Sequence, residues 1–292
     1  MSRVPTRYLS PLRYPGGKSR LAKFIRVLIE SQSPRPTRYV EPFAGGAGVG
    51  LRLLVDELVD EIVLNDLNPG IAAFWRAVFA RPDELLARLD ACSVNVEEWH
   101  SQRAIYLAEP DDDVDLGFAF FFLNRTNRSG IPDGRPIGGY EQTGPWKIDA
   151  RFDKAGLANR IEALSSFATR VTVCQADGIG LIKSYLNDPA AVIYADPPYL
   201  GKGDGLYLDT LGWDDHLRLA RMLKAGGRWL VTYDADSRVT EDLYAGLRCA
   251  EFTLSHSAAV QHVGREYAVF APSLAIPSLE KLGDKAAFVP SV

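Results

Sequence analysis

The sequence predicts an α/β protein whose main sheet is doubly wound, with helices on both faces. Two observations carry this prediction. Strand and helix patterns alternate over residues 38–65, and the same alternation returns over residues 170–233. Between them, residues 69–165 carry mostly helical patterns. The simplest arrangement is a sheet domain built from both ends of the chain with a helical insertion, and ligands of such sheets bind beyond the carboxyl ends of the strands.

The N-terminal elements follow from apolar spacing and turn residues. Residues 19–29 have apolar side chains at helical spacing, which predicts an amphipathic helix. A short strand over 38–41 runs into the glycine-rich turn 42–48, and a helix over 49–58 then leads to a strand over 61–65. This order of elements is a βαβ unit.

The rest of the chain supplies the insertion and the second half of the sheet. The pattern stays helical to about Leu123, and residues 129–147 are so rich in Gly and Pro that we expect a hairpin or a long ordered loop. The later elements are strands over 170–174, 191–195, 228–233 and near 248–254 and 266–271, and helices over 214–224 and 238–246. We expect one discontinuous domain over 1–68 and 166–272, an inserted domain over 69–165 and a peripheral C-terminal tail over 273–292.

The composition excludes several classes of protein. Of the 292 residues, 47% are hydrophobic and 24% are charged, which excludes a disordered chain. The three cysteines lie far apart and no Cys/His cluster occurs, so we expect neither a disulfide framework nor a metal site. No apolar run is typical of a signal peptide or a membrane span, so we expect a cytoplasmic protein with no membrane contact.

The charge is unevenly distributed along the chain. A net charge of −4 counts against a nucleic-acid binder when the chain is taken as a whole. Residues 1–38, however, contain nine basic side chains and one acidic one, and residues 125–160 contain seven basic and four acidic ones. A surface for nucleic acid therefore depends on whether these two basic stretches meet in space.

The turn from Pro42 to Gly48 consists mostly of small residues, so a ligand can approach its backbone and the N–H groups of the helix that follows. Asp66 stands 21 positions after Gly45 at the end of the next strand, where an acidic side chain typically binds a ribose diol. The turn is not the dinucleotide motif GxGxxG. The combination predicts a cofactor that contains a nucleoside, and a merely structural turn is the alternative.

The tetrapeptide Asp196-Pro197-Pro198-Tyr199 directly follows an apolar strand. Its prolines hold the carboxylate of Asp196 and the carbonyl of Pro197 in a fixed orientation. Such a pair of acceptors can receive both hydrogens of an exocyclic amino group, while the ring of Tyr199 stacks on a planar base. The tetrapeptide predicts catalysis on a nucleobase, and a proline turn with an incidental tyrosine is the alternative.

Two further segments suit anionic ligands. Lys18 ends a Gly-Gly-Lys loop at a helix start, but a P-loop needs a glycine six positions earlier and Leu12 stands there, which excludes a P-loop ATPase. In residues 122–130, FLNRTNRSG, arginines alternate with asparagines, and Tyr140 and Trp146 follow in the same glycine-rich stretch. This mixture suits phosphate contacts, base readout and stacking. A solvated loop is the alternative for both segments.

Taken in order, these motifs resemble the DNA adenine-N6 methyltransferases of the Dam-like, DPPY type, over residues 10–272. The resemblance implies a Rossmann-like catalytic domain that binds S-adenosylmethionine, over 1–68 and 166–272, and a target-recognition domain over 69–165. It implies methyl transfer to N6 of a flipped-out adenine in double-stranded DNA, with S-adenosylhomocysteine as the product and no metal. We expect a monomer, with a dimer as the alternative.

The resemblance also implies the roles of individual residues. The implied catalytic residues are Asp196, Pro197, Pro198 and Tyr199. The implied cofactor-binding residues are Tyr14, Gly17, Lys18, Glu41, Pro42, Phe43, Ala44, Gly45, Gly46, Asp66, Leu67, Asp177, Gly178 and Asp196. The implied DNA-binding residues are Lys18, Asn124, Arg125, Asn127, Arg128, Ser129 and Lys147. The glycine-rich segment 201–205 is expected to close over the flipped base.

The chain departs from the family at one point. GATC-specific members continue the recognition segment with an aromatic residue and then Asn-Gly-Leu, whereas this chain has Arg128-Ser129-Gly130-Ile131. We therefore expect a distinct branch, encoded in a restriction-modification system, by a phage or as an orphan enzyme. Two other functions stay open from the sequence: an RNA adenine-N6 methyltransferase with the same motifs, and a non-catalytic DNA-binding regulator on the same fold.

Overall fold

The structure is a computed structural model that describes residues 9–13, 18, 21–198, 200, 211–256 and 262–290. Contacts between Cα atoms divide the chain into two units. Met1–Gly17 and Asn68–Gln175 form the helical unit, and Lys18–Leu67 and Ala176–Val292 form the sheet unit. The expected loop over 201–205 lies outside the described residues. The functions assigned above to the two domains stay predictions.

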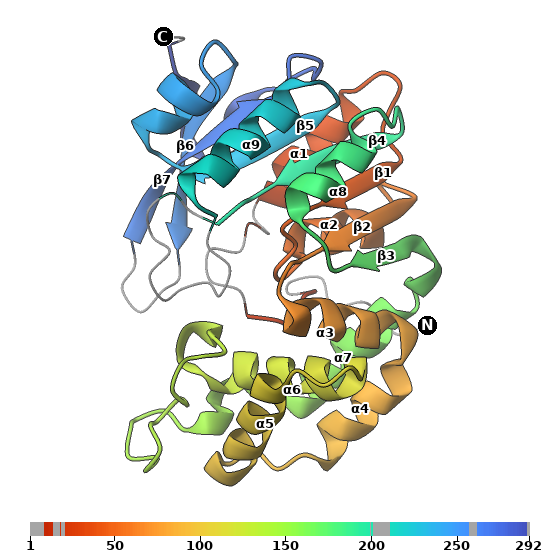
Figure 1. Ribbon diagram of the computed structural model, residues 1–292, viewed down its shortest axis with the longest axis vertical. Helices are drawn as coiled ribbons and strands as arrows, with labels where there is room; N and C mark the ends of the chain where they lie inside the picture. The colour runs from red at the N-terminus through yellow and green to blue at the C-terminus, as the bar shows by residue number, and fades with distance from the viewer. Residues whose placement is uncertain are drawn as a thin grey trace. The chain divides into compact units, whose positions relative to one another are not determined.

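An eight-stranded sheet has the strand order β3-β2-β1-β4-β5-β7-β6-β8 (Figure 1). Its strands are β1 (Arg38–Glu41), β2 (Glu61–Asn65), β3 (Val171–Cys174), β4 (Ala191–Ala195), β5 (Trp229–Asp234), β6 (Cys249–His256), β7 (His262–Phe270) and β8 (Asp284–Phe288). β1 pairs in parallel with β2 and β4, and β4 pairs in parallel with β5. β7 is antiparallel to β5 and β6, and β8 is antiparallel to β6. The predicted α/β class is confirmed.

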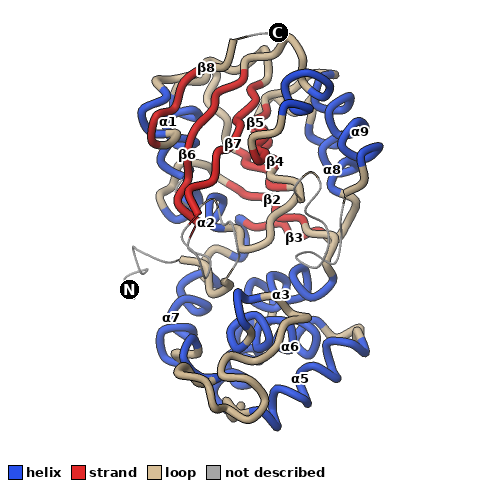
Figure 2. The backbone as a smooth tube through the Cα atoms, turned by 90° about the vertical axis from the view of Figure 1, so that its left-hand side faces the viewer, coloured by secondary structure: helices blue, strands red, loops and turns tan. Residues whose placement is uncertain are grey.

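Helices cover both faces of the sheet (Figure 2). α1 (Ala22–Glu30) and α2 (Gly48–Val55) lie on one side, and α8 (Gly178–Tyr185) and α9 (Trp213–Lys224) lie on the other. Because both faces are covered, a central strand has no solvent side, and all five positions of β4 are buried. This explains why that strand is continuously apolar instead of alternating.

The strand order places the two principal sequence motifs next to each other. The chain order reverses between β1 and β4, which pair directly from Arg38 with Ala191 to Val40 with Ile193. β1 ends at Glu41 and leads into the glycine-rich turn, and β4 ends one residue before Asp196. Parallel strands have their carboxyl ends at one edge, and such a switch point is where doubly wound sheets bind ligands.

The helical unit is built around α3 (Pro69–Ala80) and α6 (Asp113–Thr126), with α4 (Pro82–Ala91), α5 (Val96–Ala108) and α7 (Lys154–Ser165) beside them. The four phenylalanines of α6 are all buried. Gly117 lies where α6 meets the backbone of α3, because a Cβ there would come within 2.7 Å of the Cα of Phe74. Residues 122–130, which the sequence predicts to contact DNA and which are called the recognition segment below, begin near the end of this helix.

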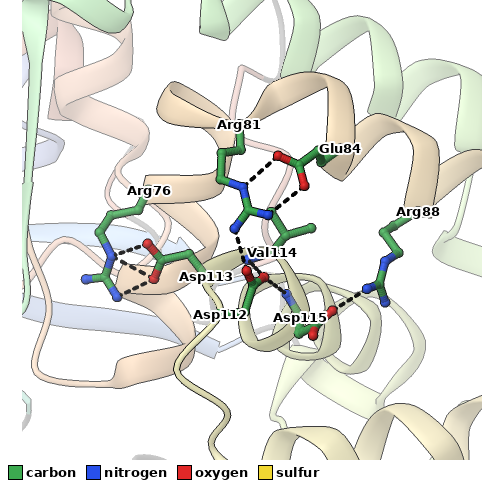
Figure 3. Close-up of polar contacts among 8 residues, drawn as sticks. All are labelled: Arg76, Arg81, Glu84, Arg88, Asp112, Asp113, Val114 and Asp115. Carbon is green, nitrogen blue, oxygen red and sulfur yellow. Dashed lines mark hydrogen bonds and ion pairs between the residues drawn. The ribbon is translucent and has the colours of Figure 1, made fainter.

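The acidic run at residues 111–113 begins α6 and is tied to the helices beside it (Figure 3). The carboxylate of Asp112 accepts the backbone N–H groups of Val114 (2.9 Å) and Asp115 (3.0 Å), which caps the helix. Its second oxygen pairs with Arg81 at 2.6 Å. Asp113 pairs with Arg76 at 2.6 Å. The run therefore anchors α6 within the helical unit.

One segment takes one of its two predicted forms, and two others differ from their predicted form. Of the hairpin or loop expected over 129–147, the structure has the loop, with one antiparallel bridge between Asn127 and Pro136. The helix expected over 238–246 is a short π-helical turn at Val239–Leu243. The chain after Pro272 adds strand β8, which the sequence did not predict. In the described part of the chain, no helix is long and apolar enough to cross a membrane.

Candidate active site and nucleic-acid interface

The glycine-rich turn after β1 is held in a compact, left-handed form. Gly45 has φ 46° and Ala47 has φ 49°, and the N–H of Ala47 donates to the carbonyl of Ala44 at 2.6 Å. The N–H of Gly45 donates to Oδ2 of Asp66 at 2.8 Å. The predicted glycine turn and the predicted ribose-binding acid are therefore in direct contact.

Asn65, which was not among the predicted site residues, fixes the position of this turn. Its backbone carbonyl accepts from Ala44 at 2.8 Å, and its Nδ2 donates to the carbonyls of Pro42 (2.8 Å) and Ala176 (3.0 Å). The N–H of Ala176 returns a hydrogen bond to Oδ1 of Asn65 at 3.0 Å. The signal available in the sequence was an amide that ends an otherwise apolar strand.

The other predicted cofactor residues of the sheet unit lie around the same turn. Asp177 caps α8 by accepting from Ile179 and Gly180, both at 3.2 Å. Gly178 packs against Phe43, because a Cβ at Gly178 would lie 2.7 Å from the ring. Leu67, next to Asp66, is 51% exposed, so its apolar surface is available for contact with a flat ligand.

Glu41 differs from the other acids because it is buried under the turn. Its carboxylate accepts from the N–H of Gly50 at 3.3 Å, and a Cβ on Gly50 would approach that oxygen to 2.9 Å. Burial raises the pKa of Glu41 well above its ordinary value. Its carboxyl group is thus held between β1 and the start of α2.

Asp196 is at the end of β4, at the switch point of the sheet. Thr232 of β5 donates its hydroxyl to Oδ1 of Asp196 at 2.7 Å, and Nζ of Lys18 lies 3.4 Å from the same oxygen. The side chain is 23% exposed, so solvent or a ligand can still reach it. Burial raises the pKa of Asp196, and Lys18 opposes this rise.

Lys18, predicted to contact both cofactor and DNA, is 5% exposed in the structure. Its ammonium group lies between two carboxylates, 3.4 Å from Asp196 and 3.0 Å from Oε2 of Glu266 on β7. The structure therefore places Lys18 beside Asp196, the first residue of the tetrapeptide that the sequence predicts to be catalytic. Of that tetrapeptide, Pro197 is buried and Pro198 is half-buried. The predicted residues Tyr14, Gly17 and Tyr199 lie outside the described residues.

The two predicted asparagines of the recognition segment are buried, and each uses its whole amide inside the helical unit. Asn124 accepts from the N–H of Arg13 (2.7 Å) and donates to the carbonyls of Arg13 (2.6 Å) and Gly130 (2.8 Å). Asn127 accepts from the indole of Trp99 at 2.6 Å and donates to the carbonyls of Ile131 and Pro132, both at 2.8 Å. In this arrangement neither amide faces solvent.

Residues of the two basic stretches meet within the helical unit. Arg13 from the first stretch donates to the carbonyl of Asn127 at 3.0 Å. Burial and the nearby charges of Arg13, Arg160 and Arg151 lower the pKa of Arg125 to about 9, so it remains charged at neutral pH. The Nε atom of Arg125 is buried and has no partner in the described structure. Such a cluster of like charges suits an anionic ligand.

The exposed members of the segment project from its loop. Arg128, Ser129 and Lys147 are exposed, and Ser129 has φ 57° in the tight turn after α6. Trp146 is 70% exposed, the largest exposure among the big apolar side chains of the described residues. An exposed indole next to basic side chains is typical of surfaces that stack on nucleic-acid bases.

No group of three or more His, Cys, Asp or Glu side chains in the described ranges could hold a metal ion. In the sheet unit, the candidate site consists of carboxylates, a lysine and small-residue turns. The helical unit, described by itself, carries an arginine cluster. These groups can bind a nucleoside, accept hydrogen bonds from an amino group and contact phosphates.

The chain is similar to known DNA methyltransferases over most of its length. The profile of the family described as D12 class N6 adenine-specific DNA methyltransferase matches residues 14–260. The type II methyltransferase M.MjaIII of Methanocaldococcus jannaschii is 25% identical over 232 residues, which cover 73% of this chain and 78% of that protein. M.CviBI, a type II methyltransferase of Paramecium bursaria Chlorella virus NC1A, is 22% identical over 245 residues, covering 82% and 88%. The retron Ec67 DNA adenine methylase of Escherichia coli is 22% identical over 243 residues, covering 80% and 79%.

Proposed function

Because the chain belongs to the D12 class of N6 adenine-specific DNA methyltransferases, we propose that Asp196 binds the amino group of a flipped-out adenine while a methyl group is transferred to its N6. The observation that carries this proposal is the placement of Asp196. It ends β4 beside the turn that follows β1, with Oδ1 held by Thr232 and Lys18 and with the side chain still accessible. An acceptor fixed in this way is aimed before the substrate arrives.

The residues at the switch point fit S-adenosylmethionine, the cofactor that this family implies. The turn from Pro42 to Ala47 offers small residues and a left-handed backbone, Asp66 offers a carboxylate for a ribose diol, and exposed Leu67 offers an apolar contact for adenine. When bound, the cofactor supplies an electrophilic methyl group on a sulfonium. Asp66 and Asn65 hold the turn in its binding form.

The chemical problem for the enzyme is that the adenine amino nitrogen is a poor nucleophile, since its lone pair is delocalised into the ring. The carboxylate of Asp196 and the carbonyl of Pro197 accept hydrogen bonds from the two N–H groups of the adenine amino group. They draw the nitrogen towards tetrahedral geometry, which frees the lone pair. Orientation and fixed dipoles provide most of the rate enhancement. The released proton can leave through Asp196 or solvent, because the amino nitrogen becomes acidic as the new bond forms.

In a duplex, the amino group cannot reach this site unless the base leaves the stack. Tyr199 follows the two prolines and is the proposed stacking partner of the flipped base. We assign duplex binding to the arginine cluster of the helical unit, Arg13, Arg125, Arg151 and Arg160, together with the exposed Arg128, Lys147 and Trp146. Phosphates are the anions that such a cluster would contact.

The buried asparagines receive a different role from the one implied by the resemblance. Asn124 binds the backbone of Arg13 and Gly130, and Asn127 binds Trp99 and the loop beyond. We propose that both are positioning residues, which hold the loop so that Arg128 and Ser129 face the DNA. Base readout then belongs to exposed side chains of the same loop.

The proposal is tested with Asp196→Ala. We expect methyl transfer to unmethylated plasmid DNA to fall at least ~10³-fold, since both the acceptor and its orientation are lost. The affinity for S-adenosylmethionine, measured by calorimetry, should stay within a few fold. Tritiated cofactor provides the activity readout, and Asp90→Ala, an exposed change on α4, is the matched control. Undiminished transfer by Asp196→Ala would falsify the assignment, and transfer to RNA but not to DNA would contradict the proposed substrate.

A further inference from the structure

Glu266 is a charged residue at a position where the fold calls for an apolar one. It lies on β7, on the same face as the buried residues Ala268 and Phe270, and its own side chain is fully buried at 0% exposure. A buried carboxylate is costly unless it is paired, and its partner here is Lys18, with Nζ at 3.2 Å from Oε1 and 3.0 Å from Oε2. The pair is therefore built into the sheet unit next to Asp196.

The pair is shared with the proposed catalytic aspartate. Lys18 also lies 3.4 Å from Oδ1 of Asp196, so its ammonium group forms ion pairs with two carboxylates. Thr232 donates to the same oxygen at 2.7 Å. Because Oδ1 has two partners, the orientation of the whole carboxylate is fixed.

From this geometry we propose that Glu266 is a positioning residue for Asp196, acting through Lys18, an inference that rests on the function proposed above. Glu266 holds the ammonium group in place at Oδ1. It also draws part of that positive charge away, so that Asp196 keeps enough electron density to accept the amino hydrogens of adenine. Packing alone does not explain the pair, because apolar residues of similar volume fill such positions at no loss of stability.

The electrostatic surroundings of Asp196 determine the direction of the test. Lys18 lowers the pKa of Asp196 and Glu266 raises it. The other titratable groups that face Asp196 are Tyr39 and Glu41 from β1, Tyr194 from β4 and Tyr233 from β5. The pKa of each is raised, with burial as the largest cause, and the three tyrosines are therefore neutral near pH 7. Removing the charge of Lys18 or of Glu266 should therefore shift the pKa of Asp196.

The experiment compares the pH dependence of kcat for Glu266→Gln and Lys18→Met, with saturating cofactor and plasmid DNA. If ionised Asp196 is the active form, activity falls as the pH drops through its pKa. Removing the negative charge of Glu266 should move this acid limb to lower pH, and removing the positive charge of Lys18 should move it to higher pH, each by about one pH unit. kcat of Glu266→Gln should fall on the order of tenfold, with KM for both substrates nearly unchanged.

Two further variants separate charge from packing. Glu266→Asp retains the charge, so its acid limb should stay at the wild-type position. If Glu266→Gln does not fold, the double variant Lys18→Met/Glu266→Leu replaces it, because removing both buried charges together is well tolerated. The acid limb of the double variant should lie at lower pH than that of Lys18→Met alone.

The inference is wrong if the acid limb stays in place in Glu266→Gln, or if Glu266→Gln and Lys18→Met move it in the same direction. The inference is also wrong if the acid limb of the double variant lies at the same pH as that of Lys18→Met. Failure of the proposed function gives a different result, namely an active Asp196→Ala enzyme. An inactive Asp196→Ala variant combined with an unmoved acid limb in Glu266→Gln rejects the role of Glu266 alone.

Discussion

The hydroxyl group of Thr232 on β5 can donate one hydrogen bond, and its two neighbours determine which of them accepts it. Its Oγ1 lies 2.7 Å from Oδ1 of Asp196 and 3.0 Å from the hydroxyl oxygen of Tyr194. An ionised carboxylate can only accept, so Thr232 donates to Asp196 and Tyr194 donates to Thr232. The result is a directed chain of hydrogen bonds from Tyr194 through Thr232 to Asp196, which orients the carboxylate and strengthens its last bond.

Replacing Thr232 by valine removes the donor and keeps the shape of the side chain. We expect kcat to fall roughly 10- to 100-fold, the value of a hydrogen bond to a charged group, with little change in KM for the cofactor. Single-turnover methyl transfer measures the effect. Thr232→Ser restores the hydroxyl and should recover most of the activity, and a serine variant as slow as the valine variant would show that the threonine methyl group matters instead.

At the residue scale, the sequence predicted the groups that end strands and missed those that act across strands. Asp196 and Asp66 could be found because each follows an apolar strand that fixes its position. Thr232 contacts Asp196, and Glu266 contacts Lys18. These contacts arise only when the strands pair and the chain folds around the sheet, so no local pattern predicts them. One signal was present for Glu266: it stands at a buried position of an alternating strand, before Ala268 and Phe270.

The asparagines of the recognition segment show a different limit. Asn is a residue type that reads adenine, and Asn124 and Asn127 stand among arginines in the sequence. Their burial depends on Arg13 and Trp99, which lie far away in the chain. Residue type alone does not distinguish an amide that faces a base from one that holds a loop.

At the scale of elements, α6 depends on its first turn. Asp112 caps the helix and pairs with Arg81, and Asp113 and Asp115 pair with Arg76 and Arg88 (Figure 3). The recognition segment follows directly from the other end of α6. A frayed α6 would therefore disturb the loop that carries the arginines.

Asp112→Ala should destabilise the protein by about 1 kcal/mol, the usual cost of removing an N-cap. Asp111→Ala is the matched control, because Asp111 is exposed and lies one residue before the cap. Asp112→Asn keeps a capping oxygen and loses only an exposed ion pair, so it should cost a few tenths of a kcal/mol. Urea unfolding followed by circular dichroism measures all three, and equal losses in the two alanine variants would contradict the capping role.

A low pH should weaken the N-cap that Asp112 provides for α6. The hydrogen bonds from Arg81 and from the backbone lower the pKa of Asp112, so the folded state binds the proton less tightly than the unfolded chain. The stabilisation is present above the unfolded pKa and is lost as the pH falls through the folded one. The difference in stability between wild type and Asp112→Ala should therefore shrink at low pH.

The elements themselves were predictable where one local pattern decides them. β1, β2 and β4 occupy the residues predicted for them, because each has apolar or aromatic residues at its centre and leads into turn residues. β8 was missed because Asp284–Phe288 has no strand pattern of its own and forms by pairing with β6. The antiparallel insertion of β7 between β5 and β6 is likewise a property of the assembled sheet.

At the scale of the whole molecule, the net charge of −4 conceals a local excess of positive charge. A surface for nucleic acid was expected to depend on whether the two basic stretches, residues 1–38 and 125–160, meet in space. Within the helical unit one member of the first stretch meets the second, because Arg13 contributes to the electrostatic environment of Arg125 in the second stretch. The basic residues from Lys18 to Arg38 belong to the sheet unit. Acidic side chains elsewhere should limit non-specific attachment to DNA, so we expect binding to depend on this cluster and the exposed loop beside it.

This distribution of charge predicts how DNA binding responds to salt. Each phosphate contact releases condensed counterions, so log K falls with log salt by about 0.9 per contact on duplex DNA. Arg128→Ala and Arg151→Ala remove exposed basic side chains of the helical unit, and each should weaken binding to plasmid-derived duplex fragments and reduce that slope by about 1. Arg221→Ala, an exposed change on α9, is the control and should leave the slope unchanged. Fluorescence anisotropy at a series of salt concentrations measures the slopes, and a fall as large in Arg221→Ala as in the other two would mean that the whole charge of the protein, and not this cluster, determines its affinity for DNA.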